Sequence, residues 1–358
     1  MTRGSNSPGC LAVAAALAIL AAVALGRPLL DGGPETVEPV ATETPVARNT
    51  AKPSGRRPGV VNIESEQGLS GTLSAGTGIV FTSGGLVLTN NHVIQGSTAI
   101  TGTDTDNRRA YRATVVGYDK TGDLAVIRLE KASGLKTAVF GDSSRVRPGD
   151  PVTAVGNAGG KGGTPSVVTG AVTALDQVVT ARDQSDGTTE RLTGLIETST
   201  PIKPGDSGGP LLNTGGQVIG INTAASGDYK METRGARRGY AIPSSRALAV
   251  ARQIERGESS PTVHIGRTAL LGVRVRSAGA TTGALVADVV PDAPAAGTGM
   301  RRGAVIVALG GAPVDSPEKL TELMLARHPG DVVRLEWIEP RNGPRRSAEV
   351  TLTEGPPQ

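Results

Sequence analysis

The sequence predicts a mainly β protein with two folded domains: an all-β barrel or sandwich, then a smaller mixed α and β domain. Between residues 60 and 254, short runs rich in Val, Ile and Thr alternate with Gly, Asn, Asp and Pro, which is typical of many short strands joined by turns. From residue 262 to 354, several short apolar runs surround one helix-like segment, SPEKLTELMLARH. We therefore expect domains at 60–258 and 262–354.

The composition limits the classes of function. The chain has 358 residues, enough for two or three domains. Its 37 basic and 33 acidic residues give a net charge of +4, too weak a bias to indicate a nucleic-acid partner. Aromatic residues make up only 2% of the chain, so there is little material for stacking bases. We expect no nucleic-acid binding, and cores built from Val, Ile, Leu and Ala.

The N-terminal region contains an uncharged apolar run, residues 10–25, after a short segment at 1–9. As a helix, this run would reach about 24 Å, and its uncharged flanks extend it toward the roughly 30 Å of a bilayer core. A transmembrane anchor over 10–30 is one alternative. A cleaved signal segment is another, since Ala22–Ala24 resembles a small-x-small cleavage site; a buried soluble helix is the third. Both membrane-related alternatives place the rest of the chain outside the cytoplasm.

Two further features describe the region before the first domain. Residues 31–59 are rich in Pro, Thr, Glu and Ala without an apolar period, which predicts a disordered linker that lets a folded domain stand away from a membrane. The single cysteine, Cys10, excludes an intramolecular disulfide. The folded domains must therefore be held together by packing.

A candidate nucleophile lies in PGDSGGP, residues 204–210. The hydroxyl of Ser207 is a weak nucleophile unless a base accepts its proton and a third group orients that base. The β-rich region contains one histidine, His92, at the end of an apolar run, and Asp123 precedes a run expected to be a buried strand. An acid there is costly to bury without a partner. The chain order His, Asp, Ser is that of chymotrypsin-like enzymes and differs from subtilisin-like and α/β-hydrolase enzymes.

The glycines around the serine have a predicted role in the same chemistry. In the segment Gly205–Asp206–Ser207, the first and last backbone N–H groups are expected to form an oxyanion hole. One such donor is typically worth about 3 kcal/mol of transition-state stabilisation. Gly208 and Gly209 are expected to keep the space above the serine open for substrate. Alone, GDSGG could also be a turn or an anion-binding nest, but the histidine and aspartate in the right order favour catalysis.

Several blocks carry a resemblance to a known family: TNNHVI, TGDLAVIRL, PGDSGGPLLN, GQVIGINTA and GYAIPSS. In this order, over residues 74–256, they resemble HtrA/DegP-type serine proteases. The resemblance implies a chymotrypsin-like double β-barrel with the triad His92, Asp123 and Ser207, and unfolded proteins as substrates. No cofactor is expected. One histidine without a nearby HxxxH or CxxC also gives no zinc site.

The C-terminal region resembles the PDZ domain of the same family. LLGVRV matches the loop and strand that receive the C-terminal carboxylate of a peptide, which assigns this role to Leu271, Gly272 and Val273. The block from residue 283 to 311 matches the strands that follow. Peptide C-termini are therefore expected partners, and a homotrimer is the assembly known in the family.

The sequence departs from the family pattern at several positions. Asp206 stands where the family usually has Asn, and residues 199–201 read Ser-Thr-Pro instead of Asp-Ala-Ala. Ala304 stands where many PDZ blocks have Asp. The aromatic residues that assemble trimers in many members are absent between residues 59 and 74, which leaves trimerisation open.

Substrate preference is predicted from the pocket segment. In this fold a pocket for Lys or Arg needs an acid about six residues before the nucleophile, and that position is Pro201. The expected pocket walls are Pro201, Ile202, Asn222, Thr223 and Ala224, and they predict cleavage after small aliphatic residues. The alternative function is a tethered chaperone or peptide-binding scaffold with little proteolysis.

Overall fold

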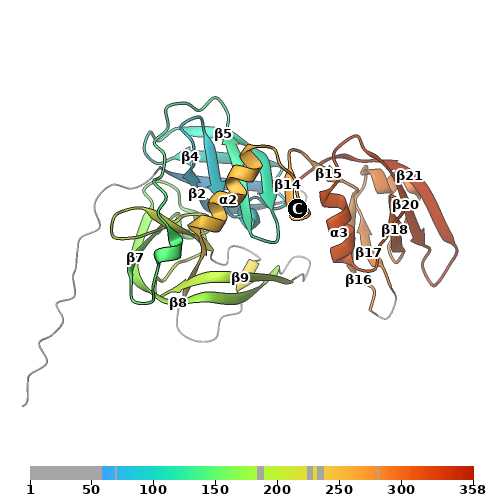
Figure 1. Ribbon diagram of the computed structural model, residues 1–358. Helices are drawn as coiled ribbons and strands as arrows, with labels where there is room; N and C mark the ends of the chain where they lie inside the picture. Colours follow the sequence, from blue (N-terminus) through green and yellow to red (C-terminus); the bar gives the residue numbers. More distant parts are fainter. Residues whose placement is uncertain (1–58, 69–70, 184–188, 224–228, 232–237, 280–281) are drawn as a thin grey trace, which may run out of the picture. The chain divides into compact units, whose positions relative to one another are not determined.

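The computed structural model describes residues 59–358, apart from 69–70, 184–188, 224–228, 232–237 and 280–281 (Figure 1). The predicted N-terminal segment, the predicted anchor and nearly all of the predicted linker lie outside the described residues. In the part that is described, no helix has the length and apolar character needed to cross a membrane.

The first closed unit is a six-stranded antiparallel barrel. Its strands follow the order β5-β4-β1-β2-β3-β6, and β5 pairs with β6 to close the ring. The short helix α1 (Asn91–Ile94) follows β3, and β14 (Val263–Ile265) pairs with β5. The barrel strands are β1 (Val60–Gln67), β2 (Thr72–Val80), β3 (Leu86–Thr89), β4 (Ala99–Asp104), β5 (Ala110–Asp119) and β6 (Leu124–Leu129).

The second closed unit has the same kind of topology. Its ring runs β8-β7-β10-β11-β13-β9, and β8 pairs with β9 to close it. Because both rings close, the first region forms barrels and not a sandwich. The strands are β7 (Pro151–Gly156), β8 (Ser166–Asp183), β9 (Thr189–Thr198), β10 (Pro210–Leu212), β11 (Val218–Thr223) and β13 (Gly239–Pro243), with β12 (Tyr229–Met231) paired to β8 and the 3-10 turns η1 (Ser143–Arg145) and η2 (Ala158–Gly160) in the loops.

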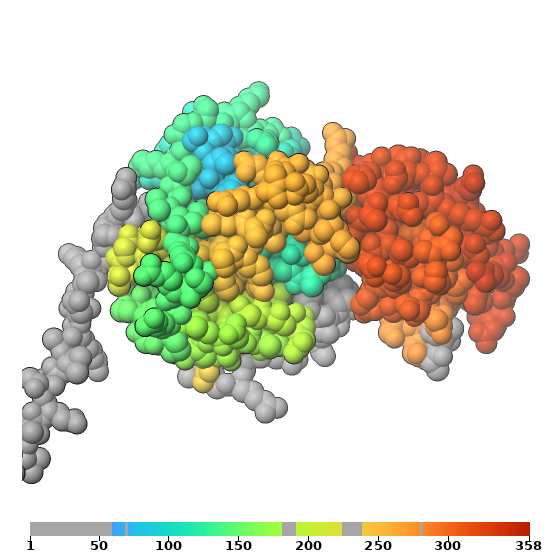
Figure 2. Space-filling view, in the orientation of Figure 1, coloured from blue at the N-terminus to red at the C-terminus, as the bar shows by residue number. Residues whose placement is uncertain are grey.

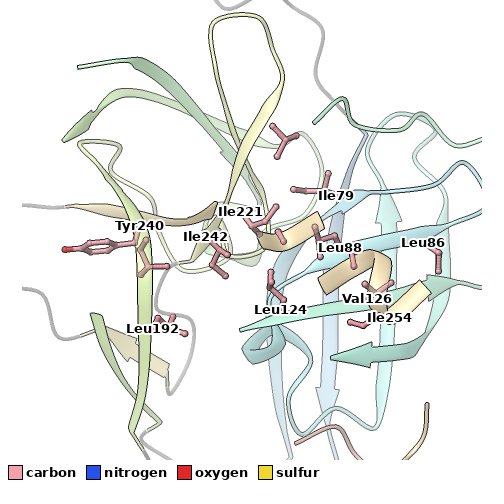
Figure 3. Packing of buried hydrophobic residues seen from close by; sticks show 14 of the residues in the cluster. Ile79, Leu86, Leu88, Leu124, Val126, Leu192, Ile221, Tyr240, Ile242 and Ile254 are labelled. Carbon is pink, nitrogen blue, oxygen red and sulfur yellow. The ribbon is translucent and has the colours of Figure 1, made fainter. Parts of the chain in front are cut away.

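A shared hydrophobic core joins the two barrels. Every residue of β3 is buried, as are the first four of β6, because both faces of these strands pack against apolar side chains. Removing such side chains from water stabilises the fold by about 25 cal/mol per Å² of apolar surface. Figure 3 shows residues of both barrels in one cluster: Ile79, Leu86, Leu88, Leu124 and Val126 from the first barrel, and Leu192, Ile221, Tyr240 and Ile242 from the second.

The helix α2 (Ser244–Glu255) packs on the outside of the barrels and closes this core. Ala247, Ala251 and Ile254 are buried at intervals of four and three residues, which places them on one helical face. Figure 2 shows the helix at the surface, coloured amber. Ser244, at the start of the helix, is also buried, and the other side chains are exposed or half-buried, as expected for an amphipathic helix.

The C-terminal region contains a separate antiparallel sheet with the order β16-β17-β18-β20-β21, in which β16 is an edge strand. Its core includes Ile306, Leu335 and Trp337. The helix α3 (Pro317–Leu325) contacts β16 and begins at Ser316, whose Oγ accepts a hydrogen bond from the Lys319 backbone. The other elements are β15 (Thr268–Leu270), β16 (Val273–Ser277), β17 (Ala284–Val289), η3 (Pro294–Thr298), β18 (Val305–Leu309), β19 (Ala312–Pro313), β20 (Val332–Ile338), β21 (Arg345–Thr351) and β22 (Thr353–Gly355).

Candidate active site

The structure brings His92 and Asp123 into direct contact. His92 lies on α1, directly after the buried strand β3, and Asp123 immediately precedes β6. The ring Nδ1 lies 2.9 Å from Oδ1 and 3.0 Å from Oδ2 of Asp123. The side chains of His92 and Asp123 are only 2% and 1% exposed. An ionised carboxylate fixes the proton on Nδ1, so the lone pair of the neutral ring lies on Nε2, where a general base needs it.

The carboxylate of Asp123 has other donors besides the imidazole ring. The backbone N–H of His92 donates to Oδ1 at 3.0 Å, and the hydroxyl of Thr223 donates to Oδ2 at 3.0 Å. The side-chain amide of Asn90 donates to the Asp123 carbonyl at 2.8 Å. Asp123 itself has φ of 52°, an uncommon value for a residue with a side chain. These hydrogen bonds satisfy a buried carboxylate and hold it against the ring.

The segment around Ser207 lies between the two barrels, just before β10. The Ser207 carbonyl accepts a 2.8 Å hydrogen bond from the backbone N–H of Thr77 on β2. On the other side, Gly208 N–H donates to Asn222 of β11 at 2.8 Å. Thr223 is the next residue on β11 and donates to Asp123. The serine segment and the His–Asp pair therefore both lie against the end of β11.

Two glycines after the serine have a different role from the one predicted. Gly208 has φ of 82°, and a Cβ there would overlap the carbonyl oxygen of Thr77. At Gly209 a Cβ would overlap the carbonyl oxygen of Val155. The prediction that these glycines keep space open for substrate is therefore wrong: they let two backbone segments approach closely.

Gly205, the residue before Asp206, can present its backbone N–H as a hydrogen-bond donor. Gly205 has φ of 95°, and a Cβ there would overlap the carbonyl oxygen of Asn157. The preceding carbonyl, of Pro204, accepts a 2.7 Å hydrogen bond from Gly159. In a trans peptide the N–H points opposite to the C=O, so Gly205 N–H is directed away from the 157–160 turn.

Asp206 is buried and fixes the serine segment to β8. Its Oδ2 accepts from the Lys203 backbone at 2.9 Å, and its Oδ1 accepts from the Ser166 hydroxyl at 2.8 Å. Burial raises the pKa of this carboxyl above its ordinary value, although the two hydrogen bonds act in the opposite direction. The side chain of Asp206 thus has a structural role beside the serine.

The predicted pocket residues lie in different environments. Pro201 and Ile202 are half-buried, and Ile202 packs against the core of the second barrel. The side chain of Asn222 donates to the Pro210 carbonyl at 3.2 Å. The hydroxyl of Thr223 donates to the Asp123 carboxylate, so both of these β11 side chains bond to groups within the protein. Ala224 lies outside the described residues.

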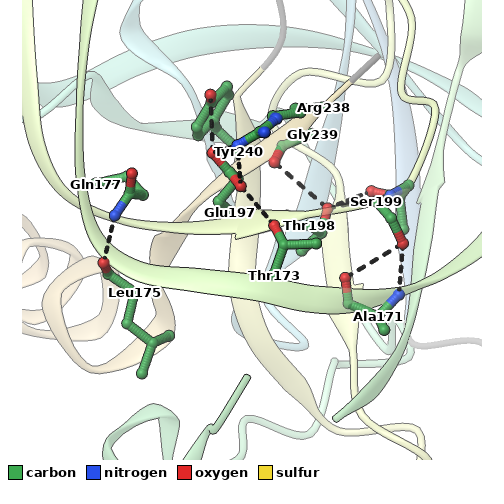
Figure 4. A network of polar contacts seen from close by, with 11 residues as sticks. Ala171, Thr173, Leu175, Gln177, Glu197, Thr198, Ser199, Arg238, Gly239 and Tyr240 are labelled. Atoms are coloured by element: carbon green, nitrogen blue, oxygen red, sulfur yellow. Dashed lines mark hydrogen bonds and ion pairs between the residues drawn. The ribbon is translucent and has the colours of Figure 1, made fainter. Parts of the chain in front are cut away.

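A buried acid supports the strands next to the pocket segment (Figure 4). Glu197 on β9 accepts hydrogen bonds from Thr173 at 2.6 Å, from Arg238 at 2.7 and 2.8 Å, and from Tyr240 at 3.2 Å. Burial raises the pKa of Glu197, but the hydrogen bonds from Arg238 and Thr173 outweigh it and leave the pKa below its ordinary value. Through these hydrogen bonds Glu197 joins β9 to β13. The residue that follows Glu197 is Thr198.

Two threonine hydroxyl groups lie at the start of the predicted pocket segment. The hydroxyls of Thr198 and Thr200 lie 2.6 Å apart, and both residues are buried. A Cβ at Gly239 on the neighbouring strand would lie 2.6 Å from the Thr200 hydroxyl. This corner, formed by Thr198, Thr200 and Gly239, is therefore tightly packed. In the ranges that the structure describes, no group of three or more His, Cys, Asp or Glu side chains is placed to hold a metal ion.

The second candidate site is the loop that enters β16. The carbonyls of Leu271 and Gly272 accept 2.9 Å hydrogen bonds from the backbone of Ala295 and Val290, respectively. The N–H groups of the same two peptides, which belong to Gly272 and Val273, therefore point to the opposite side. Gly272 has φ of 82°. Adjacent N–H groups that point outward from such a loop are suited to receive a carboxylate.

Comparison with known proteins identifies two domains in the chain. The model of the trypsin-like peptidase domain matches residues 76–221, and that of the PDZ domain matches residues 269–352. The first match covers the three catalytic candidates, and the second covers the loop before β16. The mainly β architecture thus consists of a trypsin-like barrel pair and a PDZ domain.

Three relatives of the chain are named as serine proteases. The chain is 35% identical to serine protease PepD of Mycobacterium tuberculosis over 82% of this chain and 64% of that protein. It is 34% identical to the periplasmic pH-dependent serine endoprotease DegQ of Escherichia coli, over 77% and 59%. It is 31% identical to serine protease Do-like HtrA of Lactobacillus helveticus, over 80% and 70%. The chain spans about three fifths of the length of the first relatives it matches. It belongs to the HtrA family of serine proteases.

Proposed function

We propose that the protein is an extracytoplasmic serine endopeptidase that hydrolyses peptide bonds of unfolded or damaged proteins, with a role in envelope protein quality control. The observation that carries this proposal is the buried His92–Asp123 pair at 2.9 Å, which lies against the same strand as the Ser207 segment. A binding protein has no chemical need for such a pair.

Each residue has a role in the proposed reaction. Asp123 holds the imidazole of His92, which accepts the proton of the Ser207 hydroxyl as its Oγ attacks the scissile carbonyl. The N–H groups of Gly205 and Ser207 stabilise the negative oxygen that forms, with Asp206 holding the segment between them. His92 then gives the proton to the leaving amine. Water attacks the acyl-enzyme by the same route and releases the second product.

The proposed location draws on the relatives and on the apolar N-terminal run. DegQ is named a periplasmic protein, and residues 10–30 of this chain are apolar and uncharged except for Arg27. We propose that this segment anchors the protein, with 1–9 on the inner side and the linker 31–59 outside. The protease domain 60–258 and the PDZ domain 262–354 would then be extracytoplasmic. Secretion after cleavage of a signal segment is the alternative, and assembly as a homotrimer stays a prediction.

Small aliphatic residues are the proposed preference at the cleavage position. Pro201 carries no charge, and the nearby hydroxyls of Thr198 and Thr200 bond to each other. The nearby acid, Glu197, is neutralised by Arg238. Among the described residues of this corner, a long cationic side chain would find no carboxylate free to pair with it, whereas Val or Ala needs none.

The PDZ domain is proposed to bind peptide C-termini. A peptide can add to the edge strand β16 as a further antiparallel strand, because this edge has no other partner among the described strands. Its carboxylate would bind the N–H groups of Gly272 and Val273. Val275 on β16 and Leu323 on α3 are partly buried against the same core, and they would contact the apolar side chains of the peptide.

The burial of the serine favours a second candidate function. Ser207 is 0% exposed and His92 is 6% exposed in this conformation, so a substrate reaches them only after a rearrangement. A chain that rarely rearranges would act as a tethered chaperone or peptide-binding scaffold with little proteolysis.

The test uses the full chain with unfolded, alkylated casein, with and without a peptide that ends in Val. The variants are wild type, Ser207→Ala, and the control Ser244→Ala, which removes a buried hydroxyl bonded to the Gly141 carbonyl. We expect cleavage by wild type and control, loss with Ser207→Ala, and products that end mainly in Val or Ala. Casein that is bound but uncleaved by every variant supports the scaffold. Cleavage by Ser207→Ala contradicts the proposed nucleophile.

A further inference from the structure

A threonine of the first barrel bonds directly to the proposed oxyanion segment. Thr77 lies on β2 and is fully buried. Its hydroxyl donates to the Gly205 carbonyl at 2.7 Å and accepts from the backbone N–H of Asn157 at 2.9 Å. Its own backbone N–H donates to the Ser207 carbonyl at 2.8 Å. One residue thus links β2 to both ends of the segment Gly205–Ser207.

These contacts fix the two peptide planes on either side of Gly205. The plane before it is held through the Pro204 carbonyl by Gly159 at 2.7 Å, and the plane after it is held by the Thr77 hydroxyl. Glycine has more accessible backbone conformations than any other residue. Since Gly205 has no side chain to restrict it, its orientation depends on the groups that bind the two flanking carbonyls.

The effect of the hydroxyl is separable from the folding of β2. The Thr77 carbonyl is held by the Thr89 hydroxyl at 2.7 Å, and its N–H by Ser207, whether or not the side chain carries an oxygen. Without the hydroxyl, the Gly205 carbonyl would keep only the longer contact, 3.3 Å, from Asn157 N–H. The other side of the same peptide keeps the 2.9 Å hydrogen bond from Asp206 N–H to the Lys203 carbonyl. Loss of the hydroxyl therefore loosens the carbonyl side of this peptide and leaves the backbone contacts of Thr77 in place.

We propose that Thr77 is a positioning residue: its hydroxyl holds the Gly205 carbonyl, fixes the conformation of Gly205 between its two peptide planes, and so keeps the Gly205 N–H directed into the oxyanion hole. This inference rests on the proposed function. The hydroxyl contacts neither the substrate nor the reacting atoms. It acts through one backbone donor, and such a donor matters in the transition state, when the carbonyl oxygen becomes negative, much more than in substrate binding.

The experiment compares wild type, Thr77→Val and Thr77→Ser in the full chain. Valine keeps the shape and removes the hydroxyl, whereas serine keeps the hydroxyl. We expect Thr77→Val to lower kcat on a Val-containing peptide about 10-fold to 100-fold with KM changed less than twofold. Thr77→Ser should stay within about threefold of wild type. The control Thr105→Val removes a hydroxyl that is bonded to the Val60 carbonyl at 2.9 Å and not to the Gly205–Ser207 segment. It should leave kcat unchanged.

A transition-state analogue gives a second readout. A peptidyl boronic acid forms a bond from Ser207 Oγ to boron, with the serine proton passing to His92, and presents an oxygen to the oxyanion donors. Its inhibition constant should rise with Thr77→Val by the factor by which kcat/KM falls, while the Kd of the matching peptide amide stays constant. If a thermal unfolding experiment shows that Thr77→Val is not folded, Thr77→Cys takes its place. The cysteine side chain has a similar size and is only a weak hydrogen-bond donor.

Three results would overturn the inference: unchanged kcat in Thr77→Val, a change confined to KM, or failure of Thr77→Ser to restore activity. A failure of the proposed function is distinct, because the wild-type chain would then cleave nothing or Ser207→Ala would stay active.

Discussion

The carboxylate of Asp123 accepts hydrogen bonds from both the ring Nδ1 and the backbone N–H of His92, at 2.9 and 3.0 Å. The backbone contact fixes the start of α1 relative to β6, and the ring contact fixes the tautomer. The position of the helix and the protonation of the ring thus both involve Oδ1, and the ring also faces Oδ2 at 3.0 Å. A substitution that keeps the oxygen but changes the second atom of the side chain separates these two effects.

Asp123→Asn is the corresponding prediction. Its amide oxygen can still accept from the His92 backbone, but the amide N–H₂ facing the ring would favour a proton on Nε2, the wrong tautomer for a base. In enzymes with this triad, the change lowers kcat about 10⁴-fold without loss of fold, and we expect the same here from peptide hydrolysis. The control is Asp104→Asn, a buried acid that caps the turn at Asp106 and Asn107. Equal losses in both variants would contradict the assignment.

Asp206→Asn is expected to change the pH dependence of stability. The pKa of Asp206 in the folded state is raised by burial, so its charge opposes folding. That cost is absent below the unfolded pKa of about 3.9 and fully present above the raised folded pKa. An asparagine can accept from Lys203 and donate to Ser166, whose hydroxyl also reaches the Gly156 carbonyl at 3.0 Å.

The measurement is the melting temperature of wild type and Asp206→Asn between pH 4 and 8. We expect the variant to melt a few degrees higher at pH 7, with the difference shrinking as the pH falls toward 4. The exposed position Asp288→Asn is the control for removing a carboxylate. A gain that grows toward acid pH would show that burial is not the dominant influence on this carboxyl.

Gly272→Ala should disable the peptide site of the PDZ domain. The residue has φ of 82°, and a Cβ would overlap that of Ala293. Strain and overlap together should cost about 1–3 kcal/mol and weaken binding of a peptide that ends in Val at least tenfold, measured by fluorescence anisotropy. Gly297→Ala is the matched control for adding a methyl group, because no atom lies within 4 Å of the Cβ position at Gly297. Unchanged binding in Gly272→Ala would remove this loop from the proposed site.

The sequence singles out the catalytic candidates because chain order separates the possible triads. His92, Asp123 and Ser207 each follow or precede an apolar run, and those runs become β3, β6 and β10. The position of the triad and the domain boundaries remain predictions. The two barrels, by contrast, close through the pairing of β5 with β6 and of β8 with β9. A closed sheet and an open sheet have the same alternation of apolar and polar residues, so the sequence pattern does not predict this closure.

The role of Thr223 could not be read from the sequence for a similar reason. Successive side chains on a strand point to opposite faces, so a shift of one residue decides whether a side chain meets a substrate or the Asp123 carboxylate. The sequence places β11 beside the serine but does not give its register. Thr77 carries no sequence signal either, because a lone threonine in an apolar strand is typical of any β protein.

The open edge of β16 has a consequence for solubility. An edge strand that accepts a peptide can equally accept the same strand of another molecule, and repeated pairing of this kind leads to aggregation. Arg274 and Arg276 are exposed on this strand. When two identical edges approach, these cations meet one another, whereas an incoming peptide brings a carboxylate. We expect the arginines to deter self-association and to leave the edge open to an anionic chain end.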